Sequence, residues 1–420
     1  MKLFFLCKID IAFATKVPLN KLKKATAFPS AVRHPRQTTA EFKPPGPQED
    51  LELKAISSGS FYKILYNPLI QIYPTVLSTQ IRPSPPTMAA IQAKWTKVVE
   101  AEILQRSSQI VSVIDRQVYI FGGELRPREP RDNDVHTVSL QDPATLSTKP
   151  APAQSPSPRV GTASTILNGK IYLFSGRGGT AMTPIQESGG IWEFDPSANK
   201  WSLLAPSNFQ PASIPAARSY HCTANDGKDT VFIHAGCPEK GRLSDLWAFS
   251  VSQKQWTELA PAPDPPRGGT SIAFAGGRLY RMNGFDGERE QGGRVDVYEP
   301  EANVWSSHSF GPDGVSGPSP RSVAALLPVA VSGRVYLVTL FGERDPSSLG
   351  HQGAGKMLGD VWVFDIETKL WTKIEARGDE RPDPRGWFDG DVLDDGSIVV
   401  HGGLGESNNR LGDVWTLEFF

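Results

Sequence analysis

The stretch Leu358-Gly359-Asp360-Val361-Trp362-Val363-Phe364-Asp365, followed six residues on by Trp371-Thr372, decides the fold of this chain. Its apolar residues come in short runs bounded by Asp, Thr and Lys rather than at helical spacing. This pattern is typical of two short antiparallel strands joined by a turn. Because variants of the same unit recur through most of the sequence, the chain is expected to be a repeat protein rather than a set of unrelated domains.

Each copy follows one order: an Arg, an apolar strand ending in a residue pair that closes with Gly, a variable loop, a strand carrying an aromatic residue, often as Asp-x-aromatic, and in most copies a Trp strand. The pair suits a sharp exit of the strand near a crowded centre, and the Trp residues suit packing between neighbouring units. The Arg positions, 49 to 64 residues apart, are Arg106, Arg159, Arg218, Arg267, Arg321 and Arg385. The residue pairs are Gly122-Gly123, Ser175-Gly176, Ala235-Gly236, Asn283-Gly284, Phe341-Gly342 and Gly402-Gly403.

The two ends of the repeat region complement each other. The last copy ends at Phe420 without room for its Trp strand, and the segment Lys94-Trp95-Thr96-Lys97-Val98 has the pattern of such a strand. Completing one blade from both termini removes a free sheet edge that would otherwise pair with other chains. The sequence therefore predicts an all-β fold, a six-bladed β-propeller closed by an N-terminal strand that completes the last blade.

The first 87 residues differ from the rest. They carry 12 Lys and Arg against 5 Asp and Glu, eleven prolines and no copy of the repeat. This basic segment is predicted to be disordered, either as a targeting sequence or as a stretch upstream of a natural start at Met88. Residues 88–420 are predicted to form the propeller.

Composition excludes several classes of function. Residues 88–420 carry 32 Lys and Arg against 40 Asp and Glu, and this acidic balance argues against nucleic-acid binding. No apolar run approaches the roughly 18 residues of a membrane span. Three cysteines without metal-site spacing fit a reducing compartment. We expect a cytoplasmic monomer, with mitochondrial and nuclear locations left open.

The recurrent arginines predict a binding face. In a ring of antiparallel blades they share a face with the long polar loops after the residue pairs, where binding residues are expected. Guanidinium groups at a channel mouth suit an anion such as a sulfate or a carboxylate. The alternative is that they bridge neighbouring blades. The candidate ligand-binding residues are Arg159, Arg177, Arg218, Arg267, Arg321 and Arg385.

One loop combines two carboxylates and an imidazole. Glu343, Asp345 and His351 lie within nine residues among glycines. Two oxygen donors and one nitrogen donor with open positions suit Fe(II), Mn(II) or Zn(II). The alternative is an Asp that caps its own turn beside an exposed His.

The copies resemble the kelch repeat, with about 50 residues and four strands per blade. The loop from Glu343 to Gly355 looks like that of the plant nitrile-specifier, thiocyanate-forming and epithiospecifier proteins. Further matches are Phe121 to Glu124 and Arg385-Gly386-Trp387. The resemblance implies that Glu343, Asp345 and His351 hold Fe(II), while pocket arginines with Glu124 and Trp387 contact a sulfated aglycone. In that family the Asp lies midway between Glu and His, whereas here it lies two residues after the Glu.

Two functions follow from these features. The first is a specifier-like protein that uses Fe(II) to divert an unstable sulfated small molecule without redox chemistry, as a lyase-like enzyme. The second is a kelch interaction module without catalysis, whose partner is an acidic protein segment. Neither involves nucleic acid or a membrane.

Overall fold

The computed structural model describes residues 91–378 and 380–420, without the side chain of His351. The predicted leader, residues 1–87, lies outside the described residues. The all-β prediction is confirmed: the described part consists of strands, loops and three short 3-10 turns. These turns are η1 (Glu102–Leu104), η2 (Pro211–Ser213) and η3 (Gly350–Gln352). No helix in the described part has the length and hydropathy needed to cross a bilayer.

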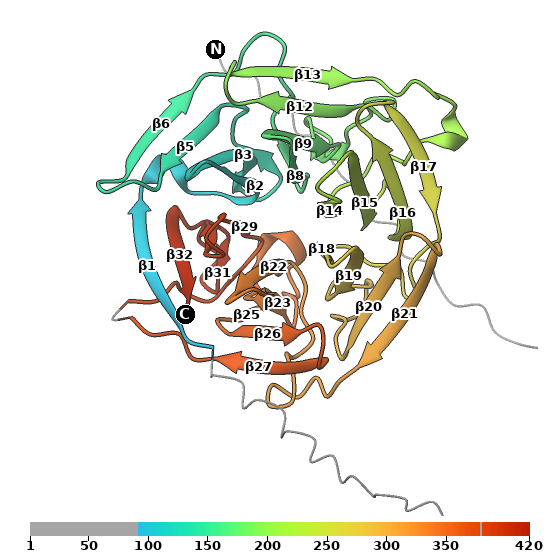
Figure 1. Cartoon of the computed structure of the whole chain (residues 1–420). Helices are drawn as coiled ribbons and strands as arrows, with labels where there is room; N and C mark the ends of the chain where they lie inside the picture. Colours follow the sequence, from blue (N-terminus) through green and yellow to red (C-terminus); the bar gives the residue numbers. More distant parts are fainter. Residues whose placement is uncertain (1–90, 379) are drawn as a thin grey trace, which may run out of the picture. The chain divides into compact units, whose positions relative to one another are not determined.

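The described residues form six main antiparallel sheets around a common axis (Figure 1). We number them along the chain and give their strands from the axis outward. The first holds β2 (Ser107–Ile114), β3 (Gln117–Arg126), β5 (Val135–Ser139) and β6 (Thr145–Lys149). The second holds β8 (Ala163–Leu167), β9 (Lys170–Phe174), β12 (Ile191–Asp195) and β13 (Lys200–Leu204). The third holds β14 (Cys222–Asn225), β15 (Thr230–Gly236), β16 (Leu243–Ser250) and β17 (Gln255–Leu259).

The other three sheets repeat this arrangement. The fourth holds β18 (Ser271–Ala275), β19 (Arg278–Met282), β20 (Arg294–Glu299) and β21 (Val304–Ser309). The fifth holds β22 (Ala325–Val331), β23 (Arg334–Leu340), β26 (Val361–Asp365) and β27 (Leu370–Ile374). The sixth holds β29 (Asp389–Val392), β30 (Ile398–His401), β32 (Asp413–Phe419) and β1 (Ala93–Glu100). Its outer strand β1 pairs antiparallel with β32, with Trp95 opposite Leu417.

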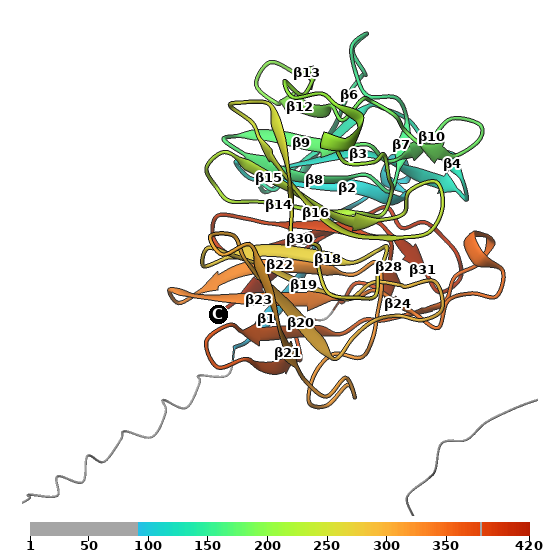
Figure 2. The same ribbon diagram turned by 90° about the vertical axis from the view of Figure 1, so that its right-hand side faces the viewer.

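Short strands of two residues lie on one face of the main sheets (Figure 2). Figure 2 shows β4, β10, β24 and β31 gathered on one side of the molecule. They belong to the segments that lead from the second to the third strand of a sheet. The bounds of the short strands in these segments are β4 (Glu129–Pro130), β10 (Arg177–Gly178), β11 (Thr183–Pro184), β24 (Glu343–Arg344), β25 (Lys356–Met357) and β31 (Leu404–Gly405). Two more short strands, β7 (Arg159–Val160) and β28 (Arg385–Gly386), precede the first strand of a sheet.

A ring of backbone hydrogen bonds joins the six sheets at the axis. The residue two positions after each recurrent Arg donates its amide to the carbonyl of the equivalent residue in the preceding sheet, at 2.6 to 3.2 Å. All six have a positive φ between 46° and 61°. We call this set the inner ring; its members are Ser108, Gly161, Tyr220, Gly269, Val323 and Trp387. The bond from Ser108 to Trp387 closes it.

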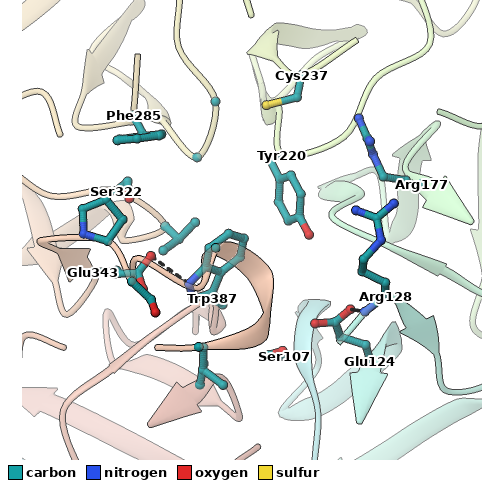
Figure 3. A pocket seen from close by; sticks show the side chains of 18 of the residues that line it. Ser107, Glu124, Arg128, Arg177, Tyr220, Cys237, Phe285, Ser322, Glu343 and Trp387 are labelled. Atoms are coloured by element: carbon teal, nitrogen blue, oxygen red, sulfur yellow. Dashed lines mark hydrogen bonds between the residues drawn. The ribbon is translucent and has the colours of Figure 1, made fainter. Parts of the chain in front are cut away.

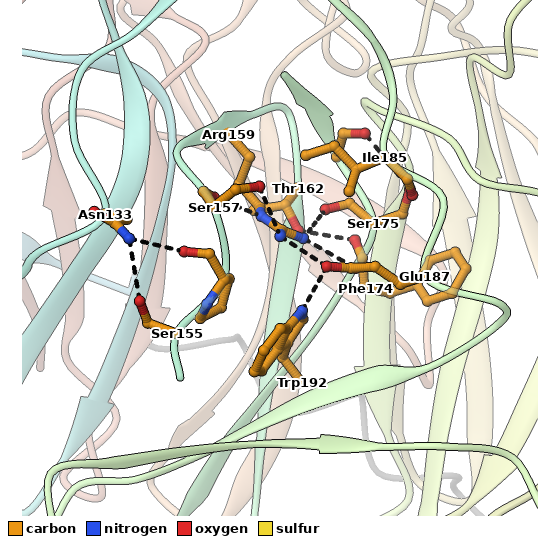
Figure 4. A network of polar contacts seen from close by, with 12 residues as sticks. Asn133, Ser155, Ser157, Arg159, Thr162, Phe174, Ser175, Ile185, Glu187 and Trp192 are labelled. Atoms are coloured by element: carbon orange, nitrogen blue, oxygen red, sulfur yellow. Dashed lines mark hydrogen bonds and ion pairs between the residues drawn. The ribbon is translucent and has the colours of Figure 1, made fainter. Parts of the chain in front are cut away.

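Five of the six recurrent arginines bind carboxylates of their own sheets. Arg218 donates to both oxygens of Asp245, at 2.6 and 2.8 Å, and Trp247 donates to the same carboxylate. Arg159 binds Glu187 in the same way, with Trp192 as the second donor (Figure 4). The other pairs are Arg106 with Asp132, Arg321 with Asp360 and Arg385 with Asp413. Bidentate pairs of this kind are among the strongest polar contacts in proteins.

Aromatic residues fill the spaces between sheets, as predicted. Trp201 packs on Phe121 of the preceding sheet with ring centroids 5.0 Å apart, and Trp256 packs on Phe174 at 5.6 Å. Trp95 of β1 stacks on Phe341 of the fifth sheet at 5.7 Å, so the N-terminal strand joins the same core. Each such ring removes a large apolar area from water.

Two carboxylates connect the sixth sheet to the first. Asp389 and Asp391 accept hydrogen bonds from the amides of Val111 and Val113, at 2.7 and 2.9 Å. Burial raises the pKa of Asp389 to about 7 and that of Asp391 to about 6. A raised carboxyl pKa means that the folded state holds the proton more tightly than the unfolded state between about pH 4 and 7.

We therefore predict that the stability contributed by this junction falls as the pH rises from 5 to 8. The double variant Asp389→Asn, Asp391→Asn keeps the acceptor oxygens without the charge. Urea unfolding at pH 5 and 8 should show a smaller loss of unfolding free energy in this variant than in the wild type. Equal losses in both proteins would contradict the assignment.

Candidate functional site: a cup above the inner ring

A cavity of about 270 Å³ opens on the face that carries the short strands. We call it the cup. Each of the six segments between second and third strands contributes to its lining, which brings together residues that are far apart in the sequence. The contributing side chains include Glu124, Arg128, Arg177, Met182, Cys237, Arg242, Phe285, Glu290, Glu343, Ser347, Leu404 and Arg410.

The floor of the cup is aromatic. Tyr220 and Trp387 belong to the inner ring, and their side chains meet edge to face with centroids 5.1 Å apart (Figure 3). Gly161 leaves room for Tyr220, because a Cβ there would lie 2.7 Å from the Tyr220 ring. Both rings also line the central channel of about 600 Å³ beneath. The pair therefore lies between the cup and the channel.

One side of the cup is cationic. Arg128, Arg177 and Arg242 line it, and none forms an ion pair with any described residue. Arg177 is held by Ser219 and by the carbonyls of Met182 and Pro238, which together engage three of its donors. A guanidinium has five N–H donors, so two remain for a ligand. The Arg242 guanidinium lies 4.9 Å from the Phe285 ring centre.

The opposite side is acidic. Glu343 is buried and accepts hydrogen bonds from the Gly355 amide at 2.7 Å and from Trp387 Nε1 at 3.2 Å. Burial raises the pKa of Glu343, and burial together with the neighbouring Glu343 raises that of Glu290. One carboxyl oxygen of Glu290 is buried without a protein partner. Figure 3 shows Glu343 across the cup from Arg128 and Arg177.

Glu124, by contrast, is neutralised within the protein. Its carboxylate accepts a hydrogen bond from Arg410 at 2.8 Å and another from the Arg128 amide at 2.7 Å. It therefore positions the cationic side rather than opposing it. The predicted residues Glu124, Arg177 and Trp387 all line the cup, so the structure brings these three together.

The other arginines that were predicted to bind a ligand do not line the cup. Arg159, Arg218, Arg321 and Arg385 are fully buried, and their guanidinium groups are engaged by carboxylates of the same sheet. The backbone carbonyls of Arg218, Arg321 and Arg385 accept a hydrogen bond from the preceding sheet, as Arg218 does from Gly176 at 2.9 Å. They therefore anchor each sheet and connect it to its neighbour. Arg267 is also buried but has no carboxylate partner among the described residues.

The predicted iron ligands do not converge within the described residues. Glu343 lines the cup, whereas the Asp345 side chain is 72% exposed and pairs with Arg344. The side chain of His351 lies outside the described part. In that part no group of three His, Cys, Asp or Glu side chains could hold a metal ion. Iron binding by Glu343, Asp345 and His351 stays a prediction.

Sequence reasoning missed several cup residues, among them Tyr220, Arg128, Arg242 and Phe285. A signal existed for Tyr220, because it follows Arg218 by two positions just as Trp387 follows Arg385. Arginines in the loops carried no such regularity, since those loops differ in length from copy to copy.

Comparison with known proteins agrees with this architecture. A family model described as the KLHDC2/KLHL20/DRC7 Kelch-repeats domain matches residues 108–342, so the chain belongs to the kelch-repeat family. An N-(sulfonatooxy)prop-2-enimidothioate sulfolyase of Thlaspi arvense is 27% identical over 357 residues, covering 77% of this chain and 97% of the relative. The kelch domain-containing protein 3 of Bos taurus is 25% identical over 348 residues, with 77% and 84% covered.

A solved structure shares the fold. The structure titled "Structure of YjhT" superposes with a TM-score of 0.57 at 15% sequence identity, covering 77% of this chain and 99% of that one. The predicted kelch propeller and its resemblance to the nitrile-specifier group are thereby confirmed.

The contact between Gly161 and Tyr220 predicts how an added Cβ at position 161 changes the free energy of unfolding, and Gly169 offers a matched control. Gly161 and Gly169 have φ values of 61° and 70°, but only Gly161 has a neighbour in the way of a Cβ. Both Ala variants should lose about 1 kcal/mol from the left-handed backbone. Gly161→Ala should lose about 1–3 kcal/mol more because Tyr220 must move. Equal losses in urea unfolding would show that Tyr220 is not held against this position.

Proposed function

We propose that the chain is a six-bladed kelch propeller, completed by β1, that binds a small organic oxyanion in the cup. The observation that carries this proposal is the set of three guanidinium groups, Arg128, Arg177 and Arg242, that line one side of the cup and form no salt bridge with any described residue. Arg177 and Arg242 are half-buried and Arg128 is exposed, and half-buried positive charges without a salt bridge favour a ligand that supplies the negative charge.

The rest of the cup suits the body of such a ligand. Tyr220, Phe285 and Trp387 offer aromatic surface against which a planar or unsaturated group can pack. The acidic side, with Glu343 and Glu290, repels a second anion and thus fixes which end of the ligand faces the arginines.

An organic sulfate is the ligand class we favour. The name of the Thlaspi arvense relative describes a lyase acting on a compound with a sulfonatooxy group, and that relative is covered by the alignment over 97% of its length. A sulfate ester has an anionic head for the arginines and an organic body for the aromatic floor. Lyase-like chemistry assisted by Fe(II) stays the prediction that the resemblance implies.

The cup proposal predicts a charge-specific loss of affinity. Arg177→Met keeps the length of the side chain and its apolar contacts but removes the charge. Its affinity for phenyl sulfate, measured by titration calorimetry, should fall by at least about tenfold, the value of one charge-assisted hydrogen bond.

A matched control lies on the same face. Arg126 is exposed and paired only weakly with Glu129, at 3.9 Å, so Arg126→Met should bind phenyl sulfate like the wild type. Phenol, which lacks the sulfate, should bind more weakly than phenyl sulfate to the wild type. No binding of phenyl sulfate, or equal binding by Arg177→Met, would reject the proposal. Binding of an acidic peptide instead would identify the cup as a protein-interaction site.

A further inference from the structure

The fourth sheet breaks the rule that pairs each recurrent Arg with a carboxylate. Arg267 makes the first two contacts of its counterparts: Nε donates to the Pro265 carbonyl and Nη1 to the Asn283 carbonyl, both at 3.1 Å. Arg218 makes the same two contacts, with Ala216 and Ala235, and then adds both oxygens of Asp245. Among the described residues, no carboxylate makes this third interaction with Arg267.

The register of the strands shows which residue of the fourth sheet stands at the position where the third sheet has Asp245. Trp247 lies opposite Ile233 in the third sheet, and at the equivalent place in the fourth sheet Asp296 lies opposite Arg281. Two residues earlier, where the third sheet has Asp245, the fourth sheet has Arg294. A positive charge therefore occupies the place of a negative one.

The result is a local excess of positive charge. The only carboxylate in contact with this cluster among the described residues is Asp296, which binds Arg281 at 2.6 Å and Arg294 at 2.8 Å. Arg267 does not contact Asp296 but lies within electrostatic range of it, so three guanidinium groups lie around one contacting carboxylate. Arg281 is fully buried, and its Nη1 has no hydrogen-bond partner. Arg267 itself is 4% exposed.

Among the described residues, no other carboxylate contacts these three guanidinium groups. Asp286 lies within electrostatic range of Arg267, but its carboxylate accepts the amides of Glu288 and Arg289. Asp264 contacts Arg294 only through its backbone carbonyl, at 2.9 Å. Solvent can reach the position, because the carboxylates that occupy it in the other sheets are 11% to 22% exposed and Arg294 is 33% exposed.

We infer that the fourth sheet holds a second anion site, separate from the cup, in which Arg267 and Arg294 bind a small oxyanion. A carboxylate or a sulfate matches the chemistry, since each presents two oxygens to a guanidinium fork. The bound oxyanion takes the place of the Asp or Glu that completes the Arg pair in each of the other five sheets. Arg267 is not part of the cup lining, so this site does not depend on the proposed function of the cup.

The test is thermal unfolding of the full chain in sulfate and in acetate, each against chloride at equal ionic strength. The wild type should be stabilised by at least one of the two oxyanions in a saturable manner. Arg294→Asp restores the residue type of the other sheets. It should unfold at a higher temperature without added oxyanion, and its response to the oxyanion should fall at least about tenfold in apparent affinity.

Two further variants keep the test decisive if Arg294→Asp folds poorly. Arg267→Lys retains the charge but loses the fork, and it should also weaken the response. Asp245→Asn removes the carboxylate from the third sheet, and it should create an additional oxyanion response that the wild type lacks. Arg177→Met changes only the cup, so the part of the response that Arg294→Asp removes should persist in this variant.

The inference fails if neither oxyanion stabilises the wild type beyond chloride. It also fails if Arg294→Asp and Arg267→Lys respond like the wild type, or if Arg177→Met abolishes the response, which would assign it to the cup. Acetate and sulfate responses together indicate a general oxyanion site, and a response to acetate alone indicates a site for carboxylates; both support the inference.

Discussion

The inner ring is the constraint on which the rest of this structure depends. Six amide-to-carbonyl hydrogen bonds, one per junction, run in a closed circle about the axis. Each member adopts a left-handed backbone, which costs a non-glycine residue about 1–2 kcal/mol. The cost applies to the four non-glycine members, Ser108, Tyr220, Val323 and Trp387. It is offset because the hydrogen bonds of the ring satisfy backbone groups that would otherwise be buried without partners. The same conformation directs Tyr220 and Trp387 toward each other to form the floor of the cup.

The arginine that precedes each member of the inner ring by two positions holds it in place. Its carbonyl receives a bond from the preceding sheet in five of the six cases, and its side chain in most sheets ends on a carboxylate that also accepts a Trp Nε1 hydrogen bond. The buried charges are thus neutralised where they lie, and those arginines are not available to a ligand. The arginines that are available, Arg128, Arg177 and Arg242, come from segments of irregular length. The buried recurrent arginines thus belong to the repeated scaffold, whereas the arginines of the irregular loops belong to the candidate binding surface.

Much of the fold could be predicted from the sequence, because strand patterns and small residues are local signals. The residue pair at Ala235-Gly236 and the Trp strand at Trp256 both have the predicted roles. The pairing of Arg218 with Asp245 was not predicted, although both recur in most copies, because the direction of a side chain within a sheet is a tertiary property. The same limit applies to the cup: Arg177 was named from its loop, while Tyr220 and Arg242 were missed. The predicted metal ligands share a loop, but the left-handed backbone at Asp345, with φ of 52°, accompanies a side chain that faces solvent.

The most direct test of this account is amide hydrogen exchange of the inner ring. If the ring constrains the whole propeller, the amides of its six members should exchange only through global unfolding. Their opening free energy should then equal the unfolding free energy of the protein measured with urea, and all six values should coincide. Faster exchange at one junction, with its own lower opening free energy, would show that the sheets open independently there and would contradict a closed ring as the organising constraint.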